Sequence, residues 1–352
     1  MRLIFSKQLL NYAFGPHHPW QPLRAQIAVE NLLRLNVLTS DHVLPPQPAS
    51  TDDLKLFHDQ DYIEFVKRMS QHGTGFLDTG DTPAMPGIFE AACYVVGAST
   101  LAVKRAIAEK TAAINLVGGL HHAHATHAAG FCVFNDVVIA ILHALKSVSR
   151  VLYVDLDAHH GDGVQEAFWT DPRVLHIDVH EDGRFLYPGT GFLHEIGEGE
   201  GRGYTVNIPL PPDASGADLL YVTQEVLRPL ADRFQPELVV VQAGADGFLG
   251  DPLSHLSYDL QSYLEAIRIV KQIAKRYANN RIVLLGGGGY HIYNTALAWV
   301  NACLILAERE PILELLTQKP PEPPPLKPVR NQPSEYVRSL VEQLRQLHRL
   351  RS

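Results

Sequence analysis

Short runs of apolar, mostly β-branched residues alternate along the chain with longer stretches whose apolar positions recur at helical spacing. The short runs are apolar at nearly every position, which predicts strands buried on both faces of a parallel sheet. We expect strands at 113–117, 151–155, 174–178, 238–242 and 282–285. We expect helices at 135–147, 163–170, 216–234, 259–276 and 292–308. This alternation predicts an α/β fold, a single domain whose central, mainly parallel sheet is flanked by helices on both faces.

The C-terminal region departs from this pattern. Residues 319–328 read KPPEPPPLKP, and a run of prolines cannot continue a helix, so we expect an extended linker. Residues 335–350 are amphipathic at helical spacing, with basic residues toward the end. We therefore predict a main domain at 1–318, a linker at 319–328 and a helical tail at 329–352 that packs on the body or on a partner.

Composition narrows the class of protein. Hydrophobic residues make up 46% of the 352 residues, which is ample for a core, and the net charge of −8 argues against a nucleic-acid or anionic-membrane binder. The N-terminal residues lack the apolar stretch of a signal peptide, and no run approaches the roughly 18 apolar residues of a membrane helix. Cys93, Cys132 and Cys303 are odd in number without C-x-x-C spacing, which favours reduced thiols and a cytoplasmic protein.

Polar and glycine residues follow each expected strand directly. The strand endings read INLVGGLHH, VLYVDLDAHHGDG, VLHIDVHEDGRF, LVVVQAGADGFLGDP and IVLLGGGGYH. In an open α/β sheet, ligands bind outside the carboxyl ends of the strands. We therefore expect these five segments to meet at one rim of the sheet.

The segment after 151–155 carries a candidate metal site. Asp157 and His159 are two residues apart, so in extended backbone they share one face. Asp246, after the strand at 238–242, can supply a third ligand. Three protein ligands with a position left open are typical of a catalytic metal, whereas a structural zinc site usually has paired cysteines.

The stretch GGLHHAHATH at 118–127 crowds four histidines into seven residues. His121 and His122 end a different strand from the candidate ligands, and Asp155 and Asp162 can each accept an N–H from one of them. A carboxylate partner fixes the tautomer of an imidazole and raises its basicity, so the pair can act as general base and general acid. His124 and His127 lie in an expected surface loop, and we assign them no role.

Four glycines precede Tyr290 in GGGGYHIYNTA. They allow a tight turn or a close backbone approach, and they place the Tyr290 phenol at the rim, where it can donate to a developing oxyanion. A phosphate-binding loop would also need a helix N-terminus and usually a lysine, and this segment has no lysine. We therefore favour the oxyanion donor.

Together, GGLHHAHATHAAGFCVFND, YVDLDAHHGDGVQEAF, YPGTG, QAGADGFLGDPL and LLGGGGYH resemble the histone deacetylase superfamily. This superfamily includes zinc-dependent deacetylases, bacterial acetoin-utilisation proteins and acetylpolyamine amidohydrolases on an arginase-like α/β fold. The motifs follow the family's order from FGPHHPWQPLR to about residue 308, which marks 1–318 as a deacetylase catalytic domain of the bacterial type.

The resemblance assigns roles residue by residue. It implies zinc ligands at Asp157, His159 and Asp246, with Fe²⁺ compatible with the same ligands, and catalytic roles for His121, His122, Asp155, Asp162 and Tyr290. It implies a K⁺ or Na⁺ site formed by Asp155, Asp157, His159, Asp178 and the carbonyl of Val179, although Asp178 stands where serine is common. It also implies substrate contacts at Asp81, Gly130, Phe131, Tyr187 and Leu253, with Tyr187 in a position where many members have phenylalanine. Arg24 corresponds to an arginine of the inner cavity.

The implied reaction is metal-dependent hydrolysis of an acetylated amine, by activated water, the two histidines and the tyrosine. The expected partner is acetyl-lysine in a protein or peptide, and the alternative is an acetylpolyamine or another small acylated amine. The absence of a clear long insertion before residue 118 favours the former. An arginase-like dinuclear site would need further Asp and His ligands where HHGDG stands, and a silent acyl-lysine binding module would lack a ligand, a histidine or the tyrosine. The sequence leaves the oligomeric state open.

Overall fold

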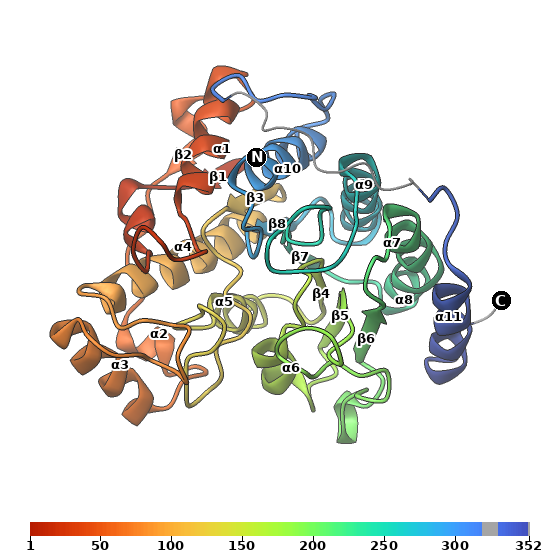
Figure 1. Ribbon diagram of the computed structural model, residues 1–352, viewed down its shortest axis with the longest axis horizontal. Coiled ribbons are helices and arrows are strands. Elements are labelled where there is room, and N and C mark those ends of the chain that lie inside the picture. Colours follow the sequence, from red (N-terminus) through yellow and green to blue (C-terminus); the bar gives the residue numbers. More distant parts are fainter. Residues whose placement is uncertain (319–329, 351–352) are drawn as a thin grey trace.

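One parallel sheet organises the molecule (Figure 1). The computed structural model describes residues 1–318 and 330–350, so the predicted linker lies outside the described residues. Within them the strand order is β2-β1-β3-β8-β7-β4-β5-β6, and every paired neighbour is parallel. The strands are β1 Arg2–Ile4, β2 Val43–Leu44, β3 Ala112–Asn115, β4 Val151–Asp155, β5 Val174–Glu181, β6 Thr205–Leu210, β7 Leu238–Gln242 and β8 Ile282–Leu285.

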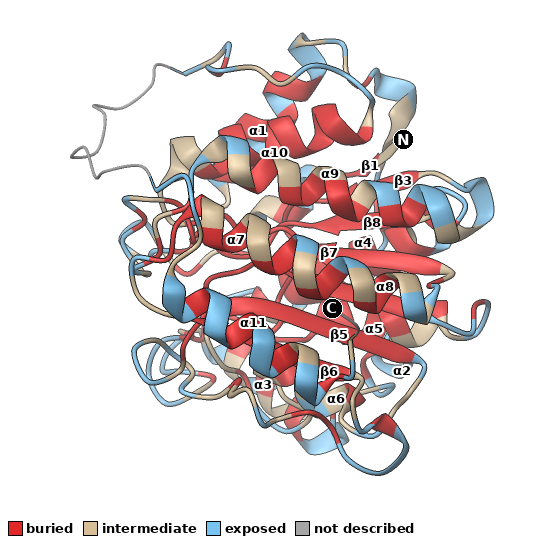
Figure 2. Cartoon of the chain, turned by 90° about the vertical axis from the view of Figure 1, so that its right-hand side faces the viewer, coloured by how far each residue is buried: buried red, intermediate tan, exposed pale blue. Residues whose placement is uncertain are grey.

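Helices cover both faces of the sheet, which confirms the predicted α/β architecture (Figure 2). One layer contains α4 and α5, which pack on each other, and the other contains α1, α10, α9, α7 and α8 in contact with one another. The helices are α1 Leu23–Arg34, α2 Thr51–Leu54, α3 Gln60–His72, α4 Ile88–Glu109, α5 Asp136–Ala144, α6 Asp162–Phe168, α7 Gly216–Val222, α8 Arg228–Phe234, α9 Leu260–Tyr277, α10 Ile292–Leu306 and α11 Glu335–Leu347. Because both faces are covered, residues of β3, β4, β5, β6, β7 and β8 are buried throughout.

The predicted helix at 216–234 is present but contains a π-helical turn, η4 Thr223–Leu227, between α7 and α8. Ser215 begins it as expected, and its backbone N–H donates to Asp218 Oδ2 at 2.8 Å. Pro229 lies in the first turn of α8 and has no N–H to donate, which accounts for the widened turn before it.

Two expectations need correction. The strand expected at 113–117 stops at Asn115, because the Asn115 side chain accepts the Val117 N–H at 3.2 Å and its carbonyl accepts the Gly118 N–H at 3.3 Å, which closes a turn. Contrary to the expectation from the sequence, α4 is long and apolar enough to cross a membrane, by length and composition only. Its most apolar window is 61% buried inside the fold, as in the core helix of a globular domain.

The predicted tail forms α11, which packs on the body against β6, α7 and η4. Its buried face consists of Val337, Leu340, Val341 and Leu344. At its start, the Ser334 N–H donates to Asp218 Oδ1 at 2.7 Å, and near its end Arg345 pairs with Glu225. The apolar face predicted for the tail is therefore buried against the body of the same chain.

Candidate metal and catalytic site

Two carboxylates and one imidazole meet beyond the carboxyl ends of β4 and β7, which are neighbours in the sheet. Asp157 and His159 follow β4, and Asp246 follows β7. All three are buried, and one ligand atom from each lies within 4.8 Å of the others. His159 Nδ1 lies 2.9 Å from Asp246 Oδ2 and 3.2 Å from Asp157 Oδ1. This donor set can hold one divalent cation.

The electrostatics of the three residues fit a cation. Burial and the neighbouring charge of Asp157 raise the pKa of Asp246 to about 8, because two buried carboxylates this close repel each other unless a positive charge lies between them. Carboxylate oxygen and imidazole nitrogen are ligands of Zn²⁺ and equally of Fe²⁺.

Neighbouring groups orient the two carboxylates. Asp157 Oδ2 accepts from Gln242 Nε2 at 2.6 Å and from the Gly288 N–H at 2.7 Å, while Asp246 Oδ1 accepts the Ala158 N–H at 2.8 Å. Such contacts hold ligands in a fixed geometry before an ion binds. Gln242 is the last residue of β7, and the sequence analysis did not single it out.

The tandem histidines lie beside this cluster, each held by a carboxylate. His121 Nδ1–H donates to Asp155 Oδ2, and His122 Nδ1–H donates to Asp162 Oδ1, both at 2.8 Å. The two rings are 4.1 Å apart between centroids, and both side chains are buried. Because an ionised carboxylate only accepts hydrogen bonds, Nδ1 carries the proton in both rings and Nε2 is left for chemistry.

The two histidines differ in proton affinity. Burial lowers the pKa of His121, but Asp155 and Asp157 outweigh it and raise that pKa to about 10. Burial and the adjacent His121 charge lower the pKa of His122 to about 4. The pair therefore combines one protonated and one neutral imidazole near neutral pH.

Asp136, which the sequence analysis missed, fixes the loop that carries these histidines. This buried carboxylate accepts the Leu120 N–H at 2.7 Å and the Gly119 N–H at 3.1 Å. It belongs to the segment GFCVFND, whose Asn135 caps α5 by accepting the Val138 N–H. The sequence does carry a signal for these two residues, because Asn135 and Asp136 form a polar pair directly before an apolar helix.

His124, to which the sequence assigned no role, contacts two carboxylates of the site. Its Nε2 lies 3.2 Å from Asp162 Oδ2, on the same carboxylate that holds His122, and its Nδ1 contacts Glu166. The His127 ring stacks on it at 4.4 Å between centroids. Both histidines lie in a loop, and His127 is exposed, as expected. The His124 contacts could not be read from the sequence, because Asp162 and Glu166 come from α6, about one helix and one strand later in the chain.

Tyr290 lies beside the metal ligands. Its ring is 6.3 Å from that of His159, and burial together with Asp246 raises the pKa of its phenol well above the usual value. The phenol therefore stays protonated and able to donate. Asp251, like Gln242 and Asp136 not found from the sequence, accepts the Tyr290 N–H at 2.7 Å.

Arg24 lies behind Tyr290 and is buried. Its guanidinium donates to the Gly289 carbonyl at 2.6 Å and lies over the rings of Trp20 and Trp299, at 4.1 and 5.1 Å from their centroids. Burial lowers its pKa. The predicted inner-cavity arginine thus contacts the backbone of the glycine segment next to Tyr290.

Two aromatic side chains flank the site. Phe131 lies 5.9 Å from the Tyr290 ring, and Tyr187 lies 5.1 Å from the His122 ring, both edge-on. Gly130, with a φ of +52°, lies between: a Cβ there would be 2.4 Å from His122 Cδ2 and 3.0 Å from Tyr187 Cε1. Only glycine fits this position.

The remaining predicted substrate contacts lie toward the surface. Asp81 is exposed on the loop after α3, and the adjacent Thr82 hydroxyl accepts the Phe131 N–H at 3.0 Å, which places Asp81 near the aromatic pair. Leu253 is half-buried, and its N–H donates to Asp251 Oδ1 at 3.0 Å.

Two of the predicted monovalent-cation residues lie side by side. Asp155 and Asp178 are register partners on β4 and β5. Asp178 accepts the Gly161 N–H at 2.8 Å and lies 2.6 Å from His180 Nδ1. The negative charge that Asp178 adds, compared with a serine at this position, is therefore already paired within the protein. A K⁺ or Na⁺ ion at this position remains a prediction.

Comparison with known proteins agrees with this geometry. A family model described as histone deacetylase domain matches residues 18–306. The chain belongs to the histone deacetylase family. It is thus a deacetylase, a hydrolase, as the sequence motifs indicated.

Relatives extend over nearly the whole chain. The acetoin utilization protein AcuC of Bacillus subtilis (strain 168) is 36% identical over 329 residues, which cover 91% of this chain and 84% of that protein. AcuC of Staphylococcus xylosus is 36% identical over 319 residues, with 88% and 83% covered. Histone deacetylase B of Dictyostelium discoideum is 35% identical over 315 residues, with 87% and 74% covered. The histone deacetylase family is therefore shared by bacterial and eukaryotic relatives.

Proposed function

We propose that this chain is a zinc-dependent deacetylase that removes acetyl groups from the side-chain amine of acetyl-lysine in proteins or peptides. The observation that carries the proposal is the three-ligand cluster of Asp157, His159 and Asp246 beside the carboxylate-held pair His121 and His122. Metal-assisted amide hydrolysis needs a metal site next to groups that can accept and donate a proton, and two histidines with shifted pKa values can do both.

Asp157, His159 and Asp246 would hold the zinc, which when bound supplies Lewis acidity toward the acetyl carbonyl and a water molecule. A K⁺ or Na⁺ ion at Asp155 and Asp178 is part of the same proposal.

The protein's own groups then move the protons. His122 is neutral near pH 7 and has Nε2 free, so it takes a proton from the attacking water. The Tyr290 phenol donates a hydrogen bond to the carbonyl oxygen as that oxygen gains negative charge. A protonated histidine of the pair returns a proton to the amine nitrogen, so that the C–N bond breaks to give a neutral amine and acetic acid. The acid then passes its proton to the more basic amine, which leaves acetate and an ammonium group.

Acetyl-lysine suits the flanking aromatic rings. Phe131 and Tyr187 can bury the methylene stem of lysine without hydrogen bonds, and Tyr187 is still 44% exposed, as expected at an entrance that meets a macromolecule. Asp81 is exposed and would contact the backbone of such a substrate. The free, buried thiols of Cys93, Cys132 and Cys303 support a cytoplasmic location.

The test is acetate release by metal-replete protein, with an acetyl-lysine peptide and N-acetylputrescine compared side by side. We expect preference for the peptide, and loss of activity on chelation. Tyr290→Phe should lower kcat by about 10²–10³-fold, or roughly 2.7–4 kcal/mol, the usual effect of losing one oxyanion donor. Tyr293→Phe is the matched control, because its hydroxyl accepts the Leu315 N–H away from the metal ligands.

Preference for N-acetylputrescine would keep the mechanism and replace the substrate by an acetylpolyamine. Full activity of the Tyr290→Phe protein would refute the role of the phenol. No turnover of either substrate by zinc-loaded protein would contradict deacetylation of both classes.

A further inference from the structure

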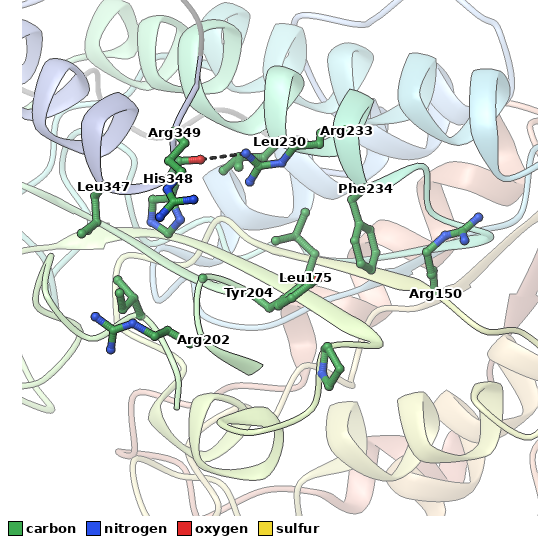
Figure 3. Close-up of a pocket in the computed structure, with 13 residues that line it drawn as sticks. Arg150, Leu175, Arg202, Tyr204, Leu230, Arg233, Phe234, Leu347, His348 and Arg349 are labelled. Carbon is green, nitrogen blue, oxygen red and sulfur yellow. Dashed lines mark hydrogen bonds between the residues drawn. The ribbon is translucent and has the colours of Figure 1, made fainter. Parts of the chain in front are cut away.

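A hollow of about 670 Å³ lies at the amino ends of β4, β5 and β6, whereas the tandem histidines follow the carboxyl end of β3. Figure 3 shows the residues that line it. Its lining includes Arg150 and Leu175 at the start of β4 and β5 and Tyr204 just before β6. Parallel strands have all their amino ends on one side of the sheet and all their carboxyl ends on the other. A five-residue strand separates the two by about 16 Å. The hollow, which we call the tail pocket, is therefore separate from the deacetylase site.

The tail of the chain completes this pocket. Leu347, His348 and Arg349, at the end of α11, line it together with Arg233 and Phe234 of α8. The Arg233 guanidinium donates to the His348 carbonyl at 2.7 Å and so fastens the end of α11 to the body (Figure 3).

The floor of the tail pocket is apolar and aromatic. Leu175 and Leu230 are buried, and the Tyr204 and Phe234 rings meet edge-on at 6.0 Å between centroids. Such a floor accepts a flat or aliphatic group and excludes water from it.

The rim is cationic in a protein whose net charge is −8. Arg150, Arg202, Arg233 and Arg349 line the pocket, and no acidic residue does so among the described residues. Arg150 lies 3.8 Å from Glu237, whereas Arg202 and Arg349 have no ion-pair partner within residues 1–318 and 330–350.

His348 provides an independent sign of a missing partner. Its side chain lines the pocket and is only 4% exposed. The Gly203 backbone is close enough to interact with the ring, but neither ring nitrogen makes a hydrogen bond of normal geometry to any described residue. Burial lowers its pKa to about 4, with the Gly203 backbone acting in the opposite direction, so the ring is neutral. A buried polar group without a well-placed partner is unfavourable, and a ligand oxygen at His348 would relieve this cost.

We propose that the tail pocket binds a small organic phosphate, with its phosphoryl groups at Arg202 and Arg349 and an aromatic or aliphatic body over the apolar floor. The planar guanidinium forks match phosphate oxygens, and several arginines call for more than one negative charge. The volume suits a small molecule. The bound ligand ties α11 to the body. This binding is independent of the deacetylase reaction.

The test is calorimetric titration of the full-length protein with ADP, which joins a diphosphate to an aromatic base, and separately with pyrophosphate and adenosine. We expect ADP to bind more tightly than either part, and more weakly as salt concentration rises. Arg202→Ala and Arg349→Gly should each weaken ADP binding at least about tenfold. Arg349 has a φ of +53°, so glycine there preserves the end of α11.

Arg68→Ala is the matched control, because Arg68 is exposed on α3, away from the pocket. It should leave ADP binding unchanged. The proposal is overturned if ADP does not bind at millimolar concentration, or if the Arg202 and Arg349 variants bind it like the parent protein. Pyrophosphate binding as tightly as ADP would refute the role of the apolar floor. Binding is the readout, so these outcomes do not depend on whether acetyl-lysine is the substrate.

Discussion

Replacing Gly288 with alanine would add one methyl group next to two proposed metal ligands. Gly288 follows β8, and its N–H already donates to Asp157 Oδ2 at 2.7 Å. An alanine Cβ would lie 2.1 Å from Asp246 Oδ2 and 2.8 Å from Asp157 Oδ2. Carbon and oxygen atoms that are not bonded approach to about 3.3 Å, so the Asp246 carboxylate must shift by about 1 Å.

A displacement of that size sets the expected effect. Misplacing a catalytic group by about 1 Å costs about 10²-fold in rate, or about 2.7 kcal/mol of transition-state free energy. We expect Gly288→Ala to fold, to bind zinc more weakly in a metal-buffered titration, and to lose about 100-fold in kcat/KM for acetate release.

Gly199→Ala is the control for a glycine substitution that lowers stability without disturbing the metal ligands. No atom lies within 4 Å of an alanine Cβ at this exposed position, but its φ of +56° strains any L-residue. It should lower stability by about 1–2 kcal/mol and leave kcat/KM unchanged. Parent-like zinc affinity and activity in Gly288→Ala would refute the assignment of Asp246 as a ligand in its observed position.

Three further predictions concern the surroundings of the site and the tail. Burial lowers the pKa of His58 to about 4, so the folded state loses up to about 3 kcal/mol as pH falls from about 6.5 to about 4, and His58→Gln should flatten this profile in urea unfolding. Burial lowers the pKa of His124, but Asp162 and Glu166 outweigh it and raise that pKa to about 9. The charged contact is therefore complete below about pH 6.5 and lost as pH rises through about 9, so kcat/KM should fall along a limb near pH 9 that His124→Gln lacks. Leu344→Ala, within the buried face of α11, should lower the free energy of unfolding by about 2–5 kcal/mol without changing kcat.

The sequence predicted the central strands well because they are buried on both faces. β4, β7 and β8 lie within the expected ranges, because a continuous apolar run can be recognised in the sequence without knowing which strands lie next to it. β1 and β2 have three and two residues, and their pairing partners are distant in the chain, so local pattern gave no signal. β6, TVNIPL, contains Asn and Pro and does not look like a central strand; it occupies the edge of the sheet.

The helices before residue 112 were missed for a different reason. In α4 apolar residues occur on most sides, so the stripe that marks a surface helix is weak, and the alternation with strands begins only after it. The loop from the end of β3 to α5 shows the other limit. Residues at strand ends could be read from spacing, but Asp136 and His124 act through partners fixed only by the tertiary fold.

The strand order also constrains how the chain can be made. β8 is the last strand in sequence, yet it lies between β3 and β7. A nascent chain that has not yet released residues 282–285 from the ribosome therefore holds two half-sheets with unpaired inner edges, and such edges invite association with other chains. Only when β8 enters do the histidine loop after β3 and the ligands after β4 and β7 reach one rim. Hydrolytic activity and protection from aggregation should thus arise together, late in synthesis, and premature termination before β8 should yield neither.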